Sequence, residues 1–197
     1  MNKIFLVAFS FLSIYSCSQN LQKIDLSTLN KFEERSLPIV LETEDYSVYN
    51  LFDNKEEWDD VNLITTKNGC RYKYGYKISK SNYFIIIYPR ECNDSLTYWL
   101  TTINLKGEIV STLEILGLYN DDQSTNGYLS DNLQIKLVHR TLLKNDNKEA
   151  KVKALESEEN YRINNSGEIL LVGKMEKMIR YYNLDSKGKF ILIETNH

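Results

Sequence analysis

A turn motif that occurs three times constrains the fold of this chain most strongly. Each copy begins with Asn or Asp and places Gly three positions later, in residues 104–107, 164–167 and 185–188. Asn and Asp start tight turns, and Gly supplies the positive φ that hairpins need. The copies join strand-like runs in pairs, namely 97–103 with 108–116, 161–163 with 168–172, and 178–182 with 190–194. We therefore expect an antiparallel meander of hairpins.

Other runs rich in β-branched and aromatic residues predict further strands. Residues 70–78 and 83–88 read as a hairpin around a turn at 79–82, and Pro89 ends its second strand. Strands are also expected at 37–41, 46–50, 61–66 and 133–143, with a short one at 151–155. Ser27 is expected to cap a short helix that starts at Thr28. The predicted fold is mostly β, an antiparallel meander that forms a curled sheet or a two-sheet sandwich, with a short N-terminal helix.

The first sixteen residues have the pattern of an export signal. Lys3 supplies a positive charge, and residues 4–15 form an apolar run. This run is too short to cross the roughly 30 Å hydrocarbon core of a bilayer, which favours a secretory signal over a membrane span. Residues 1–16 are thus expected to be a signal peptide.

The end of this signal, with Ile14, Ser16 and Cys17, resembles the lipobox of bacterial lipoproteins. The resemblance implies cleavage before Cys17, a diacylglycerol on its sulfur and a fatty acid such as palmitate on the new N-terminus. Ser18 in place of Asp resembles lipoproteins sent to the outer membrane, and the lack of an acidic cluster after Cys17 favours the periplasmic side over the cell surface. The alternative is an ordinary secretory peptide cleaved near Ser16. The whole chain is similar to small envelope lipoproteins of Bacteroidota.

The remaining length suits one domain. Residues 17–23 are expected to be a lipid-anchored tether, and residues 24–197 a single mostly-β domain. Loss of Lys3 with the signal leaves 23 basic and 27 acidic residues, without a basic stripe. This pattern argues against a nucleic-acid partner.

Cys70 and Cys92 flank the predicted hairpin symmetrically about its turn. Folding the hairpin brings both sulfurs to its open end, and disulfides persist in an exported protein. We expect a disulfide; two free thiols or a metal site are the alternatives. Zinc requires more ligands than His139 and His197 can add, so neither a metal nor a cofactor is expected.

The sequence predicts no catalytic residues. His139 continues the apolar alternation of Leu133, Ile135 and Leu137, which is typical of a packed or edge histidine. Residues 122–127 resemble the first half of a calcium loop, but Leu133 stands where the bidentate Glu belongs. A polar loop is expected there.

Two further patterns concern binding and modification. Tyr72, Tyr74 and Tyr76 alternate with basic residues, which predicts either tyrosines packed inward or an exposed platform for a partner. Ser95, between Asp94 and Leu96, resembles the short sequence at which Bacteroidota attach O-glycans to exported proteins.

Together these patterns favour a lipid-anchored envelope protein that acts as a binding module for a protein or glycan partner, and not as an enzyme. One alternative is an immunity-type protein that neutralises a toxin in the periplasm. Another is an enzyme with an unrecognised site around His139.

Overall fold

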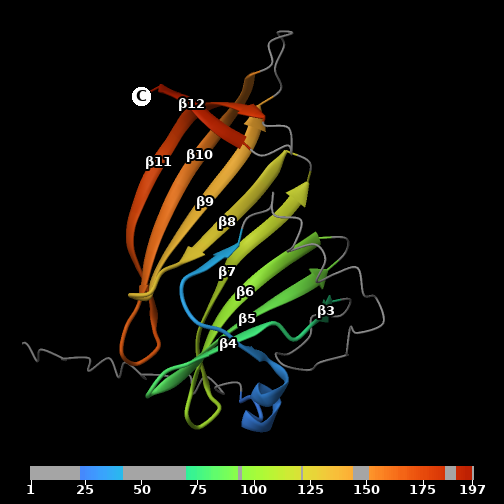
Figure 1. Ribbon diagram of the computed structural model, residues 1–197, viewed down its shortest axis with the longest axis vertical. Helices are drawn as coiled ribbons and strands as arrows, with labels where there is room; N and C mark the ends of the chain where they lie inside the picture. The colour runs from blue at the N-terminus through green and yellow to red at the C-terminus, as the bar shows by residue number, and fades with distance from the viewer. Residues whose placement is uncertain are drawn as a thin grey trace, which may run out of the picture.

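The computed structural model describes residues 23–41, 70–92, 95–120, 122–143, 151–184 and 190–196. They form a twelve-stranded sheet and one short helix (Figure 1). The helix is η1 (Leu26–Lys31), and the strands are β1 (Glu33–Glu34), β2 (Ile39–Leu41), β3 (Cys70–Tyr72), β4 (Tyr76–Ser79), β5 (Tyr83–Cys92), β6 (Ser95–Asn104), β7 (Ile109–Asn120), β8 (Gln123–Leu129), β9 (Gln134–Leu143), β10 (Lys151–Ile163), β11 (Ile169–Leu184) and β12 (Phe190–Asn196). No helix within these ranges is long and apolar enough to cross a bilayer.

The predicted antiparallel meander is confirmed. Strands β4 to β12 lie side by side in chain order, and each pairs antiparallel with the next. β1 extends the sheet beside β4 in parallel, β2 pairs with the end of β8, and β3 pairs with the end of β5. The result is one continuous curled sheet.

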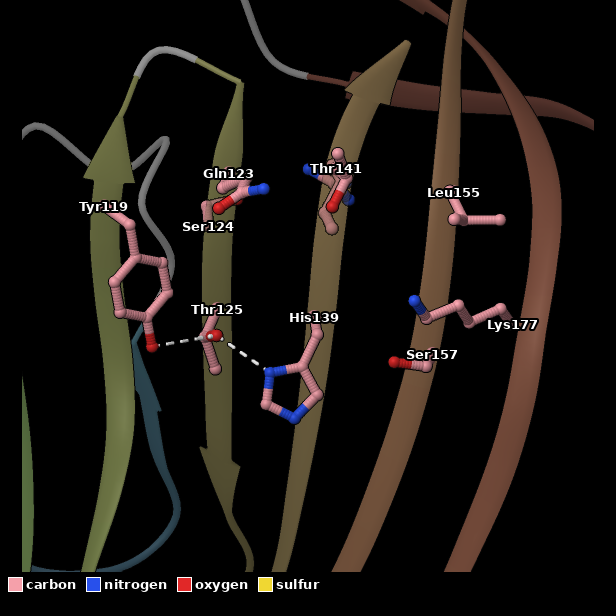
Figure 2. Close-up of a pocket in the computed structure, with 10 residues that line it drawn as sticks. Tyr119, Gln123, Ser124, Thr125, His139, Thr141, Leu155, Ser157 and Lys177 are labelled. Atoms are coloured by element: carbon pink, nitrogen blue, oxygen red, sulfur yellow. Dashed lines mark hydrogen bonds between the residues drawn. The ribbon is translucent and has the colours of Figure 1, made fainter.

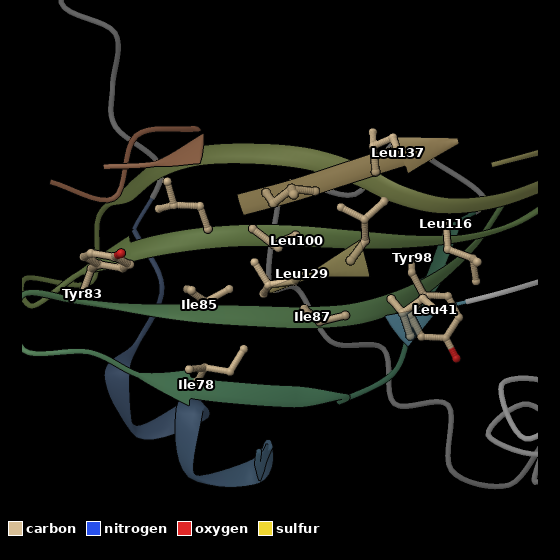
Figure 3. Packing of buried hydrophobic residues seen from close by; sticks show 13 residues of the cluster. Leu41, Ile78, Tyr83, Ile85, Ile87, Tyr98, Leu100, Leu116, Leu129 and Leu137 are labelled. Atoms are coloured by element: carbon tan, nitrogen blue, oxygen red, sulfur yellow. The ribbon is translucent and has the colours of Figure 1, made fainter. Parts of the chain in front are cut away.

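The main core fills the inside of the curl (Figure 3). Ile85, Ile87 and Leu100 from the first half of the meander pack with Ile135 and Leu137 from the second half. We call the face that carries this cluster the inner face. All five side chains are at most 2 % exposed, so the curl is closed by apolar burial between the two halves of one sheet.

Two polar contacts fix the curl. The Thr102 hydroxyl donates to the carbonyl of Gly167 over 2.6 Å, and the Ile169 amide donates to Ser111 Oγ over 3.2 Å. At Gly127 a Cβ atom would lie 2.2 Å from the Ile115 carbonyl oxygen. Glycine therefore permits β8 to cross β7 closely.

The outer face of β5 and β6 is covered by the N-terminal segment. Ile24, Leu29 and Phe32 pack against Ile86 and Ile103. The predicted short helix is present as a 3₁₀ helix, but its cap is Asp25 rather than Ser27. The Asp25 carboxylate accepts a hydrogen bond from the Ser27 amide over 2.9 Å, because a carboxylate is an effective acceptor at this position.

The first two predicted turns share one hydrogen-bond pattern. Asn104 Oδ1 accepts from the Lys106 and Glu108 amides, and Gly107 has φ of 81°. Asn164 and Gly167 repeat this arrangement, with φ of 88° at the glycine. The third motif, at 185–188, lies outside the described residues, although the strands it joins, β11 and β12, do pair.

Four expectations about strands need correction. Pro89 does not end its strand, because β5 continues through it to Cys92 beside β6. Residues 122–127 are not a loop, because Gln123 to Leu129 form β8 between β7 and β9. The short strand at 151–155 and the run at 161–163 belong to one thirteen-residue strand, β10. The runs at 168–172 and 178–182 likewise belong to the sixteen-residue β11. The strands expected at 46–50 and 61–66 fall outside the described residues.

Candidate functional site

A polar pocket of about 250 Å³ lies on the inner face, above the apolar core (Figure 2). Its position follows from strand register. Thr125, His139 and Ser157 are direct neighbours across β8, β9 and β10, and Gln123, Thr141 and Leu155 form the next row. His139 shares its face with Ile135 and Leu137, as the alternation predicted. The other residues that close the pocket include Tyr119 and Lys177.

The imidazole of His139 has a hydrogen-bond partner on one side and a carboxylate on the other. Its Nδ1 lies 2.9 Å from Thr125 Oγ1, and its Nε2 lies 3.5 Å from Glu159 Oε2. A carboxylate beside Nε2 favours a proton on that nitrogen, so Nδ1 accepts from the Thr125 hydroxyl. The side chain remains 37 % exposed, which leaves the ring accessible from the pocket.

Glu159 is the charged centre behind the pocket. Lys174 Nζ donates to it over 2.6 Å and the Tyr161 hydroxyl over 2.7 Å. These two bonds, with the charge of Lys174, lower the pKa of Glu159 to about 2. The carboxylate is therefore ionised at neutral pH. The stability it contributes is present above its unfolded pKa, near 4.5, and is lost as the pH falls toward 2.

Tyr119 forms the wall of the pocket next to β8. Its hydroxyl donates to Glu114 and lies 3.4 Å from Thr125 Oγ1. Burial, followed by the hydrogen bond to Glu114, raises the pKa of Tyr119 to about 12. The phenol thus stays protonated at neutral pH.

Thr125, His139 and Glu159 place a hydroxyl, an imidazole and a carboxylate in a row. Hydrolases use this set when the hydroxyl is open to substrate. Here Thr125 lines the pocket but is only 2 % exposed, so little of its side chain is accessible to a carbonyl or phosphoryl centre. Across the described ranges no three His, Cys, Asp or Glu side chains converge to hold a metal ion.

The opposite face of the same strands carries a charged groove of about 430 Å³. At its floor, Glu156 is 1 % exposed and accepts from Arg140 Nε and from the Tyr182 hydroxyl, each over 2.6 Å. Arg180 Nε lies 3.4 Å from the second oxygen of Glu156, and Arg180 Nη2 donates to Glu158 over 3.1 Å. These charges mostly satisfy one another, which is the behaviour of a structural network.

Tyr72, Tyr74 and Tyr76 do not form one exposed platform. Tyr72 is 4 % exposed, and it packs with Tyr74 under the N-terminal segment, where Phe32 meets Tyr74 edge-on. Tyr76 belongs to the other face and packs against the main core. The alternation fails because β3 and β4 are separate strands on β5, divided at Gly75, where a Cβ would lie 2.2 Å from the Ile87 carbonyl oxygen.

Cys70 and Cys92 are cross-strand partners in β3 and β5 and form the expected disulfide, with a Cα–Cα distance of 4.3 Å. Arg90 donates to Cys70 Sγ over 3.3 Å. Ser95 is the first residue of β6 and pairs with Cys92, whereas Asp94 before it is outside the described residues. Cys17, the expected lipidation site, also lies outside them.

Sequence reasoning did not find Thr125, Glu159 or Tyr119. Thr125 was assigned to a loop, and Glu159 lies in the acidic stretch that separated two predicted strands. The sequence feature that could have indicated β8 was the alternation of Gln123, Thr125 and Gly127, which lie on one face of this strand between β7 and β9.

No protein-family model, curated protein or solved structure matches this chain. The interpretation of the pocket therefore depends on its own geometry.

Proposed function

We propose that the protein is anchored by lipid at Cys17, on the periplasmic side of the outer membrane, and binds a small hydroxylated ligand in the inner-face pocket. The ligand class that fits is one sugar unit of an envelope glycan. The main support for this proposal is the composition of the pocket, in which hydroxyl, amide and imidazole groups extend across neighbouring strands from a phenol ring at one edge.

The chemistry of the lining supports a sugar. Gln123, Thr141 and Ser157 offer both donors and acceptors, which match the paired donor and acceptor character of sugar hydroxyls. The 45 % exposed Tyr119 adds an aromatic surface, and Lys177 adds a cation for an acidic group. A volume of about 250 Å³ suits a single small unit rather than a long chain.

The fixed geometry of the pocket supports binding over catalysis. His139 is held by Thr125 and Glu159, and Tyr119 is held by Glu114, so a ligand meets side chains that are already oriented. Preorganisation of this kind reduces the entropy lost on binding. The buried Thr125 hydroxyl donates its hydrogen bond to the His139 imidazole and is poorly placed as a nucleophile.

Lys177→Met and Ser157→Leu are expected to weaken saccharide binding, because the first removes the cation and the second fills the pocket. The measurement is a titration of neutral and carboxylated monosaccharides and disaccharides, followed by the ¹H–¹⁵N NMR signals of the His139 ring. Lys136→Met is the matched control, since Lys136 lies on β9 but lines the groove of the opposite face.

If Lys136→Met weakened saccharide binding equally, the ligand would be assigned to the charged groove instead of the pocket. No binding of any saccharide, together with capture of a protein partner sensitive to Lys177→Met, would assign the pocket to a protein instead. Turnover of a bound saccharide that disappears in His139→Ala would establish the enzymatic alternative.

Cys17→Ser is expected to abolish fatty-acid labelling and to remove the protein from the membrane fraction, because the sulfur is the site of attachment. A single acyl chain binds membranes only marginally, so stable anchoring needs the full lipid set. Cys92→Ser is the control, since it should keep its label. A wild-type protein that stays unlabelled and soluble would refute the anchor.

A further inference from the structure

Exposed aliphatic side chains gather where the described chain begins. Leu105, at the tip of the β6–β7 hairpin, is 53 % exposed, and Leu26 in η1 is 37 % exposed. Leu26 lies against the turn that carries Leu105, because a Cβ at Gly107 in that turn would lie 3.7 Å from Leu26 Cδ2. Exposed aliphatic side chains also occur on β11 and β12, so this pair is distinguished by its position beside the start of the described chain and not by its exposure.

The chain is fastened at this same tip. The Ile24 amide donates to the Gly107 carbonyl over 2.8 Å. The backbones of Lys23 and Glu108 form an isolated antiparallel β-bridge, and the Lys23 ammonium lies 3.6 Å from the Glu108 carboxylate. Cys17 precedes Lys23 by six residues. Six residues span at most roughly 20 Å when fully extended, so a lipid on Cys17 keeps the hairpin tip near the bilayer.

We propose that this end of the sheet, with Leu26 and Leu105, docks on the bilayer surface. The inference rests on the proposed lipid anchor and adds an orientation to it. The hairpin tips of β4–β5, β6–β7 and β10–β11 and helix η1 lie at the lower end of the molecule in Figure 1, while β12 lies at the upper end. Docking at the lower end therefore turns the upper part of the inner face away from the membrane.

The shape and charge of the tip suit a lipid surface. The turn is held by Asn104 Oδ1, which accepts from the Lys106 and Glu108 amides, so Leu105 projects from a rigid support. Lys106 next to it is exposed, and a cation beside an aliphatic side chain is typical of interfacial segments that meet phospholipid headgroups. The short tether leaves little space for a protein partner between tip and bilayer.

The test uses the lipidated full-length protein, reconstituted in vesicles of phosphatidylethanolamine and phosphatidylglycerol that carry brominated acyl chains. Leu105→Trp places a fluorophore at the tip, and Lys106→Trp is a second variant in the same turn. Ile191→Trp is the matched control, because Ile191 is 52 % exposed on β12 at the far end. The wild-type signal of Trp58 and Trp99 is subtracted.

Docking predicts that bromine quenches most of the added fluorescence of Leu105→Trp and Lys106→Trp and leaves Ile191→Trp unchanged. Fatty-acid labelling of the same preparations separates the two proposals. A labelled protein whose tip variants are not quenched, or are quenched no more than Ile191→Trp, overturns docking and leaves the anchor intact. An unlabelled protein overturns both.

Discussion

Replacement of Glu156 by Ala is expected to lower the free energy of unfolding by about 3–5 kcal/mol, the cost of breaking a buried ion pair by removing one partner. Glu156 is 1 % exposed and accepts from Arg140 and Tyr182 over 2.6 Å. The Arg140 side chain is 11 % exposed and that of Arg180 is 19 % exposed. Without the carboxylate, the poorly hydrated Arg140 loses the acceptor of its Nε, while Arg180 keeps its hydrogen bond to Glu158.

Urea unfolding followed by circular dichroism measures this loss. Glu33→Ala is the matched control, because its ion pair with Arg35 is about half exposed on both sides, and such pairs contribute at most about 1 kcal/mol. A second variant, Glu156→Leu combined with Arg140→Met, removes both charges and should recover most of the loss. If Glu156→Ala were as mild as Glu33→Ala, the network would carry no stability.

Removal of the Cys70–Cys92 bridge is expected to lower the free energy of unfolding by about 2–5 kcal/mol, mainly because the unfolded chain gains freedom. The bridge closes a loop with a sequence separation of 22 and joins β3 to the end of β5. Tyr72 and Arg90 pack beside it, so its loss also loosens this corner of the sheet.

A double-mutant cycle gives the sharpest test of the bridge. Cys70→Ser, Cys92→Ser and the double variant should lose the same stability, since either single change already opens the ring. Addition of a reductant should bring the wild type to the same value. Two thiols that react with an alkylating reagent in unreduced, denatured wild type would contradict the bridge.

The sequence predicted those parts of the fold whose signals are local. The turns at Asn104 and Asn164 depend on hydrogen bonds between residues two to four positions apart. The strand at 83–88 is marked by its own apolar run, and the disulfide follows from hairpin symmetry. Each of these features is fixed by chemistry within about one hairpin.

The parts that were not predicted depend on distant partners. The middle of β10 reads as a polar gap because Glu156 and Glu158 look solvated, yet Arg140 and Arg180 neutralise them from β9 and β11. β8 reads as a loop because its polar residues face a pocket that β7, β9 and β10 build. No local alternation indicates that a charge or hydroxyl will meet its partner from another strand.

The pairing of β2 with β8 constrains the order in which strands can join the sheet. Ile39 to Leu41 lie beside Gly127 to Leu129, and β1 lies beside β4. A chain emerges from synthesis with its N-terminal end first, yet these early segments gain their neighbours only after later strands have appeared. Contacts between residues this far apart form slowly, and unpaired strands are prone to aggregate while they wait. Residues 39–41 therefore cannot take their place in the sheet until residues 127–129 have been made and lie beside them.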